Sequence, residues 1–255
     1  MSVTAVTGSA SGIGAAVCQQ LRDAGHTVIG IDRQQAEVVA DLSNEEGRKE
    51  AAEQVMAISH GKLDGLVCCA GLGVTAPSSS LVVSVNYFGS TQLIELLQPA
   101  LLKEDKSAIT IIGSVAASQQ AAQPHAITQL MLNNDEAGAR AAADELGQPH
   151  IAYAASKYAL TLHGRQLAVK NGNTGVRLNI VAPGAIETPL HEASKNDPRF
   201  GEAVRNFIAP IGRNGQPSEI ADAVSFLQSP KASFIHGSIL YVDGGMDAMI
   251  RNGKL

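Results

Sequence analysis

The sequence predicts an α/β protein built on one doubly wound parallel sheet, and two patterns carry this prediction. Short apolar runs alternate with longer stretches of helical character along the 255-residue chain. Runs such as those at 27–32 and 107–114 are apolar on both faces, as expected of parallel strands that helices cover on both sides. Because one α/β core often uses this length, we expect a single domain over residues 1–255.

The expected elements alternate from the amino terminus onwards. Strands are expected at 2–8, 27–32, 36–42, 64–71, 107–114, 176–184 and 238–245. Helices are expected at 12–24, 45–60, 81–103, 152–170 and 217–228. Right-handed crossovers bring the carboxyl ends of parallel strands to one edge of the sheet, so we expect the functional site at that edge.

Two segments interrupt the alternation. Residues 117–150 contain breaks at proline and glycine, but Ile127, Leu130 and Met131 recur at helical spacing, which predicts a helical-hairpin insert before the helix at 152–170. Residues 187–212 form a connection too long for a simple turn. It has an apolar helical face formed by Phe200, Val204, Phe207 and Ile208. This face predicts a substrate lid, and the alternative is that it packs onto the domain.

Composition narrows the class of protein. The chain has 19 basic and 24 acidic residues, a net charge of -5, which disfavours nucleic-acid binding. Its three cysteines include the adjacent pair Cys68 and Cys69, which suits buried thiols in a reducing compartment. No leader or membrane-length apolar run is recognisable, so we expect a cytoplasmic protein without membrane contact. The seven histidines lack metal-ligand spacing, and no metal is expected.

A glycine-rich loop follows the first expected strand. Its sequence, TGSASGIG, places Gly8, Gly12 and Gly14 between a strand and a helix, with Ser11 and Ile13 among them. Glycine allows a tight turn and lets backbone N–H groups approach a pyrophosphate, which the helix amino terminus also attracts. A structural turn is the alternative, but the position within a βαβ unit favours a dinucleotide site.

Acidic residues follow the next two expected strands. Asp32 ends the strand at 27–32, where a carboxylate accepts hydrogen bonds from both hydroxyls of an adenosine ribose and repels a 2′-phosphate. NAD is therefore the expected cofactor. Arg33 could instead bind a 2′-phosphate, which keeps NADP as an alternative cofactor, unless Arg33 is only a solvated surface residue. Asp41 and Leu42 are placed to border the adenine, and a loop-capping aspartate is the alternative.

These residues resemble the short-chain dehydrogenase/reductase family, and the resemblance spans nearly the whole chain. The matching motifs are TGSASGIG, Asp32, Asp64 at the start of DGLVCCAG, Asn86, Ser114, Tyr153 and Lys157 of YAASK, and PGAIETP at 183–189. The long insert, VSVNYFG around Asn86 and the HGS…VDGGMDA ending are most similar to bacterial 3α-hydroxysteroid dehydrogenases, which are also carbonyl reductases.

The chemistry of three residues fits hydride transfer. Reduction of a ketone leaves negative charge on oxygen, so the site needs a proton donor and a polarising hydrogen bond. Tyr153 and Ser114 provide these groups, and Ser118 is the alternative serine. Lys157 lies four residues after Tyr153, on the same helical face, and its ammonium is expected to lower the pKa of the phenol.

The resemblance implies further roles. Lys157 would hold the nicotinamide ribose, and Asn86 would support a water that leads protons to solvent, although a polar residue satisfying the backbone is the alternative. Thr188 would bind the cofactor's carboxamide or pyrophosphate, unless it only caps a turn or helix. Ala70 and Gly71 would contact the cofactor through the backbone. The family's Asn-Asn-Ala-Gly is changed here, because cysteines occupy the first two positions.

The combined interpretation is an oxidoreductase that uses NAD(H) and a small hydrophobic secondary alcohol or ketone. The resemblance implies a 3α-hydroxysteroid or 3-ketosteroid substrate. The alternatives are an NADP-preferring carbonyl reductase and a nicotinamide-sensing binding protein. Family members usually dimerise through the helix that carries Tyr153 and Lys157. Because the insert precedes that helix, we expect a homodimer or homo-oligomer with an atypical interface, near 238–247.

Overall fold

The computed structural model describes all residues except 1, 105, 121–123 and 253–255. Its centre is a seven-stranded sheet in the order β3-β2-β1-β4-β5-β6-β7, with every pairing parallel. The strands are β1 Val3–Thr7, β2 Thr27–Asp32, β3 Val38–Val39, β4 Gly65–Cys68, β5 Ala108–Ile112, β6 Arg177–Pro183 and β7 Ile239–Val242. The predicted single domain with a doubly wound parallel sheet is confirmed.

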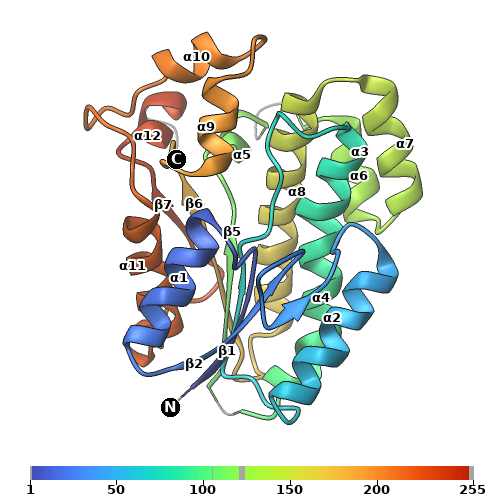
Figure 1. Ribbon diagram of the computed structural model, residues 1–255, viewed down its shortest axis with the longest axis vertical. Coiled ribbons are helices and arrows are strands. Elements are labelled where there is room, and N and C mark those ends of the chain that lie inside the picture. Colours follow the sequence, from blue (N-terminus) through green and yellow to red (C-terminus); the bar gives the residue numbers. More distant parts are fainter. Residues whose placement is uncertain (1, 105, 121–123, 253–255) are drawn as a thin grey trace.

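Helices cover both faces of the sheet (Figure 1). On one face lie α1 (Gly12–Asp23) and α11 (Pro217–Gln228), which pack against each other. The other face carries α2 (Glu45–Ile58), α4 (Gly89–Leu101) and α8 (Pro149–Lys170). Each layer encloses its own apolar cluster, and the strands contribute side chains to both clusters. This arrangement explains why the strand sequences are apolar on both faces.

Two predicted elements differ in organisation from the structure, beyond shifts of a few residues at the ends of the others. The strand expected at 36–42 is reduced to the two residues of β3, because it pairs only with Ile31 and Asp32, where β2 ends. The helix expected at 81–103 is three consecutive segments. These are α3 (Ser79–Val83), the π-helical turn η1 (Ser84–Phe88) and α4.

The insert before α8 contains a helical hairpin. Its described helices are α5 (Ala116–Gln120), α6 (Ala126–Leu132) and α7 (Glu136–Leu146), and 121–123 lie outside the described residues. Helix α6 packs against α7 and α8, and α7 also packs against α3. The hairpin shares the main apolar cluster through Ile127, Met131, Ala139 and Ala143. Helix α8 already begins at Pro149, two residues inside the predicted insert.

The segment at 187–212 forms two short helices above the carboxyl edge of the sheet (Figure 1). They are α9 (Pro189–Lys195) and α10 (Gly201–Asn206). The apolar face predicted over one helix extends beyond α10, because Phe200 precedes it and Ile208 follows its end. The chain finishes with a 3-10 turn, η2 (Pro230–Ala232), then β7 and α12 (Met246–Arg251).

Candidate active site

A cavity of about 790 Å³ opens at the carboxyl ends of the central strands. This volume lies in the range of small-molecule and cofactor sites. Every predicted cofactor contact lines it: Gly8, Ser11, Gly12, Ile13, Gly14, Asp32, Asp41, Leu42, Ala70, Gly71, Tyr153, Lys157 and Thr188. Ser114 lines the same cavity, whereas Asn86 lies fully buried behind it. The structure thus brings the predicted residues together at the expected edge of the sheet.

The glycine loop has little space for side chains. Gly8 has a φ of +67°, and a Cβ there would lie 2.9 Å from the backbone of Ala70. A Cβ at Gly14 would lie 2.1 Å from the carbonyl oxygen of Gly8. Ser11 caps the amino end of α1 without a side-chain hydrogen bond to the helix. The loop therefore requires glycine and presents the amino terminus of α1 to the cavity, which suits a bound anion.

Asp32 is held at the end of β2 by two backbone amides. Its Oδ2 accepts from the Ala10 N–H at 3.0 Å, and its Oδ1 accepts from the Arg33 N–H at 2.7 Å. An ionised carboxylate has about four acceptor positions, so both oxygens keep capacity for ribose hydroxyls. The exposed Arg33 also lines the cavity. Asp41 accepts from the Ser43 N–H at 2.9 Å, which realises the loop-capping alternative, and it borders the cavity as well.

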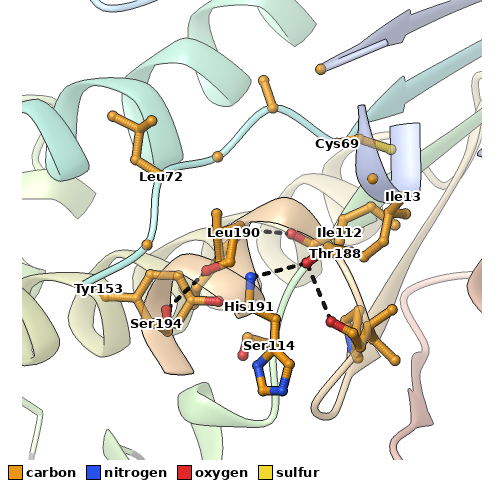
Figure 2. A pocket seen from close by; sticks show the side chains of 18 of the residues that line it. Ile13, Cys69, Leu72, Ile112, Ser114, Tyr153, Thr188, Leu190, His191 and Ser194 are labelled. Carbon is orange, nitrogen blue, oxygen red and sulfur yellow. Dashed lines mark hydrogen bonds between the residues drawn. The ribbon is translucent and has the colours of Figure 1, made fainter. Parts of the chain in front are cut away.

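Ser114, Tyr153 and Lys157 meet around the cavity from two elements. Ser114 follows β5 and accepts a hydrogen bond from the Ala116 N–H at 3.1 Å. Tyr153 is the fifth residue of α8, and Lys157 lies one turn further on. The Lys157 ammonium donates to the Ile112 carbonyl at 2.8 Å. Figure 2 shows Ser114 and Tyr153 among the side chains that surround the cavity.

The electrostatics of the phenol differ from the expectation. Burial raises the pKa of Tyr153, and the neighbouring Ser114 hydroxyl opposes this shift. Burial also lowers the pKa of Lys157 to about 8. The expected lowering of the Tyr153 pKa by the Lys157 ammonium is therefore wrong for this structure. For both Tyr153 and Lys157, desolvation by burial is the largest cause of the pKa shift.

Asn86 fixes the loop after β4. It lies in η1, and its Oδ1 accepts from the Leu72 N–H at 2.7 Å while its Nδ2 donates to the Leu72 carbonyl at 3.0 Å. Its Nδ2 also donates to the Ser156 hydroxyl at 3.2 Å. Asn86 thus satisfies the backbone, as its alternative interpretation proposed. A Cβ at Gly71 would lie 3.4 Å from Asn86 Oδ1 and 3.5 Å from Lys157 Nζ, so Gly71 separates these two groups.

Two further candidates make local hydrogen bonds. Thr188 caps α9, because its hydroxyl accepts from the His191 N–H at 3.2 Å (Figure 2). This realises the helix-cap alternative at a position that lines the cavity. Ser118 donates to the Asp247 carboxylate at 2.5 Å and is absent from the cavity wall. Ser114, which lines the wall, therefore has the geometry expected of the polarising serine.

Sequence reasoning missed several wall residues. Leu190 and Ser194 of α9 lie over the cavity near Tyr153, and Leu72 lines it opposite them (Figure 2). Three of the four residues of the predicted apolar face also line it, whereas Ile208 is 53% exposed. His150 packs its ring against Phe200 with centroids 5.3 Å apart. The apolar spacing predicted Phe200, Val204 and Phe207, whereas the motifs adjacent to Leu72, Leu190 and Ser194 predicted no role for those three residues.

Two absences concern only the part of the chain that the structure describes. Within it, no group of three or more His, Cys, Asp or Glu side chains is arranged to hold a metal ion. Within the same residues, no helix combines the length and apolar character that crossing a bilayer requires.

Comparison with known proteins identifies the class. Residues 2–126 match the short chain dehydrogenase profile, and residues 141–247 match the profile described as Enoyl-(Acyl carrier protein) reductase. A 3-alpha-hydroxysteroid dehydrogenase/carbonyl reductase of Comamonas testosteroni is 46% identical over 98% of both chains. The fold, the glycine loop and the Ser-Tyr-Lys arrangement agree with these matches. This chain belongs to the short-chain dehydrogenase/reductase family of oxidoreductases.

A solved structure narrows the similarity further. The 3-alpha-hydroxysteroid dehydrogenase from Pseudomonas sp. B-0831, crystallised with NADH, is 55% identical, superposes with a TM-score of 0.97 and covers 100% of both chains. A more distant relative is a Glucose 1-dehydrogenase of Gluconobacter oxydans, which is 31% identical and matches over 94% of this chain and 90% of its own. Family membership alone therefore leaves the substrate open, whereas the similarity to the hydroxysteroid dehydrogenases extends along the whole chain.

Proposed function

We propose that this protein transfers a hydride between NAD(H) and a hydrophobic secondary alcohol or ketone of the 3α-hydroxysteroid and 3-ketosteroid class. One observation carries the proposal: a single cavity joins the glycine loop and Asp32 to Ser114, Tyr153 and Lys157. The similarity to two hydroxysteroid dehydrogenases supports the substrate class, and the NADH in one of them supports the cofactor.

The cavity fits NAD by the chemistry of its wall. Gly8 leaves the space that a Cβ would fill, the amino terminus of α1 attracts a pyrophosphate, and Asp32 accepts hydrogen bonds from ribose hydroxyls. A 2′-phosphate about 4 Å from the Asp32 carboxylate would be repelled by about 4 kcal/mol per unit charge at an effective dielectric of 20. Arg33 opposes this preference, because it lines the cavity beside Asp32.

The protein's own groups manage the proton and the charge on oxygen. NAD(H), when bound, supplies or accepts the hydride. The Tyr153 hydroxyl donates a proton to the oxygen of a ketone as negative charge develops there, and Ser114 donates a second hydrogen bond to that oxygen. A raised pKa keeps Tyr153 protonated at neutral pH, which suits reduction. Alcohol oxidation needs the deprotonated phenol as base, so it should be favoured at higher pH.

Lys157 and Asn86 support this chemistry from behind the reacting groups. The Lys157 amine lies beside Gly71 and donates to the Ile112 carbonyl. It also lines the cavity, where it would hold the nicotinamide ribose. Asn86 holds the Leu72 backbone and would position a water that passes protons to solvent. Thr188 would contact the carboxamide or pyrophosphate from the start of α9.

The walls beyond Tyr153 favour an apolar substrate. We assign 187–212 as the substrate lid, because α9, α10 and the residues that flank α10 contribute apolar side chains to the cavity. These side chains are Leu190, Ala203, Val204, Phe200 and Phe207. Burying the apolar surface of a flat, fused-ring substrate contributes about 25 cal/mol per Å² to its binding free energy. A sugar has little apolar surface to bury.

The assembly is proposed to be a homodimer or homo-oligomer with an atypical interface, in the cytoplasm. Helix α6 covers part of α8, the helix through which the family usually dimerises. The segment expected at the interface, 238–247, contains the exposed Leu240, and the fully exposed Phe234 shortly precedes it. Light scattering should give a dimer or larger oligomer. An assembly in which the two Tyr153 helices pack across a two-fold axis would contradict this interface.

The experiment that tests the function is a set of initial rates with NADH and NADPH against 3-ketosteroids, simple cyclic ketones, sugars and acyl thioesters. We expect turnover of the 3-ketosteroids and cyclic ketones with NADH, and of 3α-hydroxysteroids with NAD. Higher kcat/KM with NADPH would favour the carbonyl-reductase alternative. Cofactor binding without turnover of any substrate would favour the nicotinamide-sensing alternative. Turnover of sugars or acyl thioesters alone would contradict the proposed substrate class.

A further inference from the structure

A fully buried arginine, Arg48, lies behind the adenine end of the cavity. It has no solvent-exposed surface, although it projects from α2 near the molecular periphery. Moving a guanidinium out of water is costly unless its donors are paired. The side chain therefore persists there because the surrounding elements supply acceptors for it.

Arg48 connects three separate elements. Its Nε donates to the Leu42 carbonyl at 2.9 Å. One terminal nitrogen donates to Gln92 of α4 at 2.7 Å and to Glu136 of α7 at 2.7 Å. The other donates to the second Glu136 oxygen at 2.6 Å. The two-pronged contact with Glu136 is a bidentate ion pair, the strongest arrangement available to these groups.

The loop that receives the first of these bonds borders the cavity. Asp41 and Leu42 line it, and β3 supplies only two paired residues just before them. The Leu42 carbonyl is therefore fixed by the Arg48 donor rather than by the sheet. Gly89 of α4 packs so closely that a Cβ there would lie 3.1 Å from the same carbonyl oxygen. A small movement of Arg48 would thus displace the wall of the adenine pocket.

Glu136 belongs to the insert and opens α7, a helix that contributes none of the residues lining the cavity. It is 21% exposed at the side chain, whereas Arg48 is fully buried. The ion pair and the Leu42 carbonyl therefore link α7 of the insert to the loop of Asp41 and Leu42. This chain of contacts gives the insert a role beyond covering α8.

We propose that Arg48 and Glu136 are positioning residues for cofactor binding, through which the helical insert sets the loop of Asp41 and Leu42 against the adenosine half of NAD(H). The inference rests on the proposed function, because it takes the cavity to hold NAD(H). Neither residue touches the reacting atoms. Loss of the pair should weaken cofactor affinity while the chemical step at Tyr153 continues normally.

The test uses two conservative variants. Glu136→Gln keeps the shape but removes the charge of the acceptor, and Arg48→Lys keeps a charge but cannot reach Leu42, Gln92 and Glu136 together. We expect the NADH dissociation constant, measured by the change in NADH fluorescence on binding, to rise about tenfold in each. AMP, which carries only the adenosine half, should lose affinity by the same factor in competition. At saturating NADH, kcat should stay within about twofold of the wild type.

A matched control separates positioning from loss of stability. Ala143→Gly weakens α7 at a buried position by about the helix propensity of one residue and leaves the ion pair in place. It should lower Tm without changing the NADH or AMP affinity. If Arg48→Lys fails to fold, Glu136→Gln decides the test.

The outcomes separate a failure of the proposed function from a failure of the positioning role. If the wild type binds no NADH, the proposed function is wrong and the inference is wrong with it. If the wild type binds NADH and both folded variants bind NADH and AMP as tightly, the positioning role is wrong and the proposed function stands. A fall in kcat at unchanged cofactor affinity would also overturn the positioning role.

Discussion

The Lys157 ammonium donates a 2.8 Å hydrogen bond to the carbonyl oxygen of Ile112. This bond joins α8, which carries Tyr153, to the end of β5, which leads to Ser114. The catalytic groups of two different elements are thereby held in register at the carboxyl edge of the sheet. The amine is buried, and burial lowers its pKa to about 8.

The lowered pKa of Lys157 makes a specific contribution to stability. Its usual pKa is 10.5, so between about 8 and that value the unfolded chain binds more protons than the folded one, and this contribution rises with pH. The buried thiols act oppositely above pH 9, because burial raises their pKa values. We expect the wild type to gain stability relative to Lys157→Met between pH 8 and 10.5. Urea unfolding of both proteins at several pH values measures the difference in their free energies of unfolding. A difference that stays constant between pH 8 and 10.5 would contradict the lowered pKa of Lys157.

Asp32 should govern the choice between NADH and NADPH. Asp32→Asn removes the charge that repels a 2′-phosphate but keeps an acceptor for the Ala10 N–H. The ratio of kcat/KM values for NADH and NADPH should fall by up to about a thousandfold, the equivalent of the estimated repulsion. Initial rates with both cofactors check this. An unchanged ratio would mean that Arg33 or another group controls the preference.

The glycine loop should tolerate no side chain at Gly14. The Cβ introduced by Gly14→Ala would lie 2.1 Å from the Gly8 carbonyl oxygen, so the loop must move away from the pyrophosphate. NADH affinity should fall by more than about tenfold, as loss of one or more charge-assisted hydrogen bonds implies. Gly25→Asn is the control, because nothing lies within 4 Å of a Cβ there and Asn tolerates its φ of +81°. Equal NADH titrations for both variants would refute this role.

Local and periodic signals predicted most of the fold and much of the candidate site. The glycine loop comes immediately after one strand and Asp32 ends the next. Because parallel strands end at the same edge of a sheet, the sequence predicts that the loop and Asp32 meet there. The π-helical turn at 84–88 left no such signal, because a wider turn depends on what surrounds Asn86. The pair of Arg48 and Glu136 was equally hidden, because its partners are far apart in the sequence. Likewise, the raised pKa of Tyr153 depends on burial, which spacing alone does not reveal.

The central claim is that the Tyr153 hydroxyl transfers the proton that accompanies hydride transfer. Tyr153→Phe removes one oxygen and keeps the ring, so the fold and the NADH affinity should be preserved. The decisive measurement is kcat for reduction of a 3-ketosteroid with saturating NADH by this variant, beside its Tm. We expect a fall of about 10² to 10⁴ with Tm close to that of the wild type. Wild-type turnover by the folded variant would contradict the account.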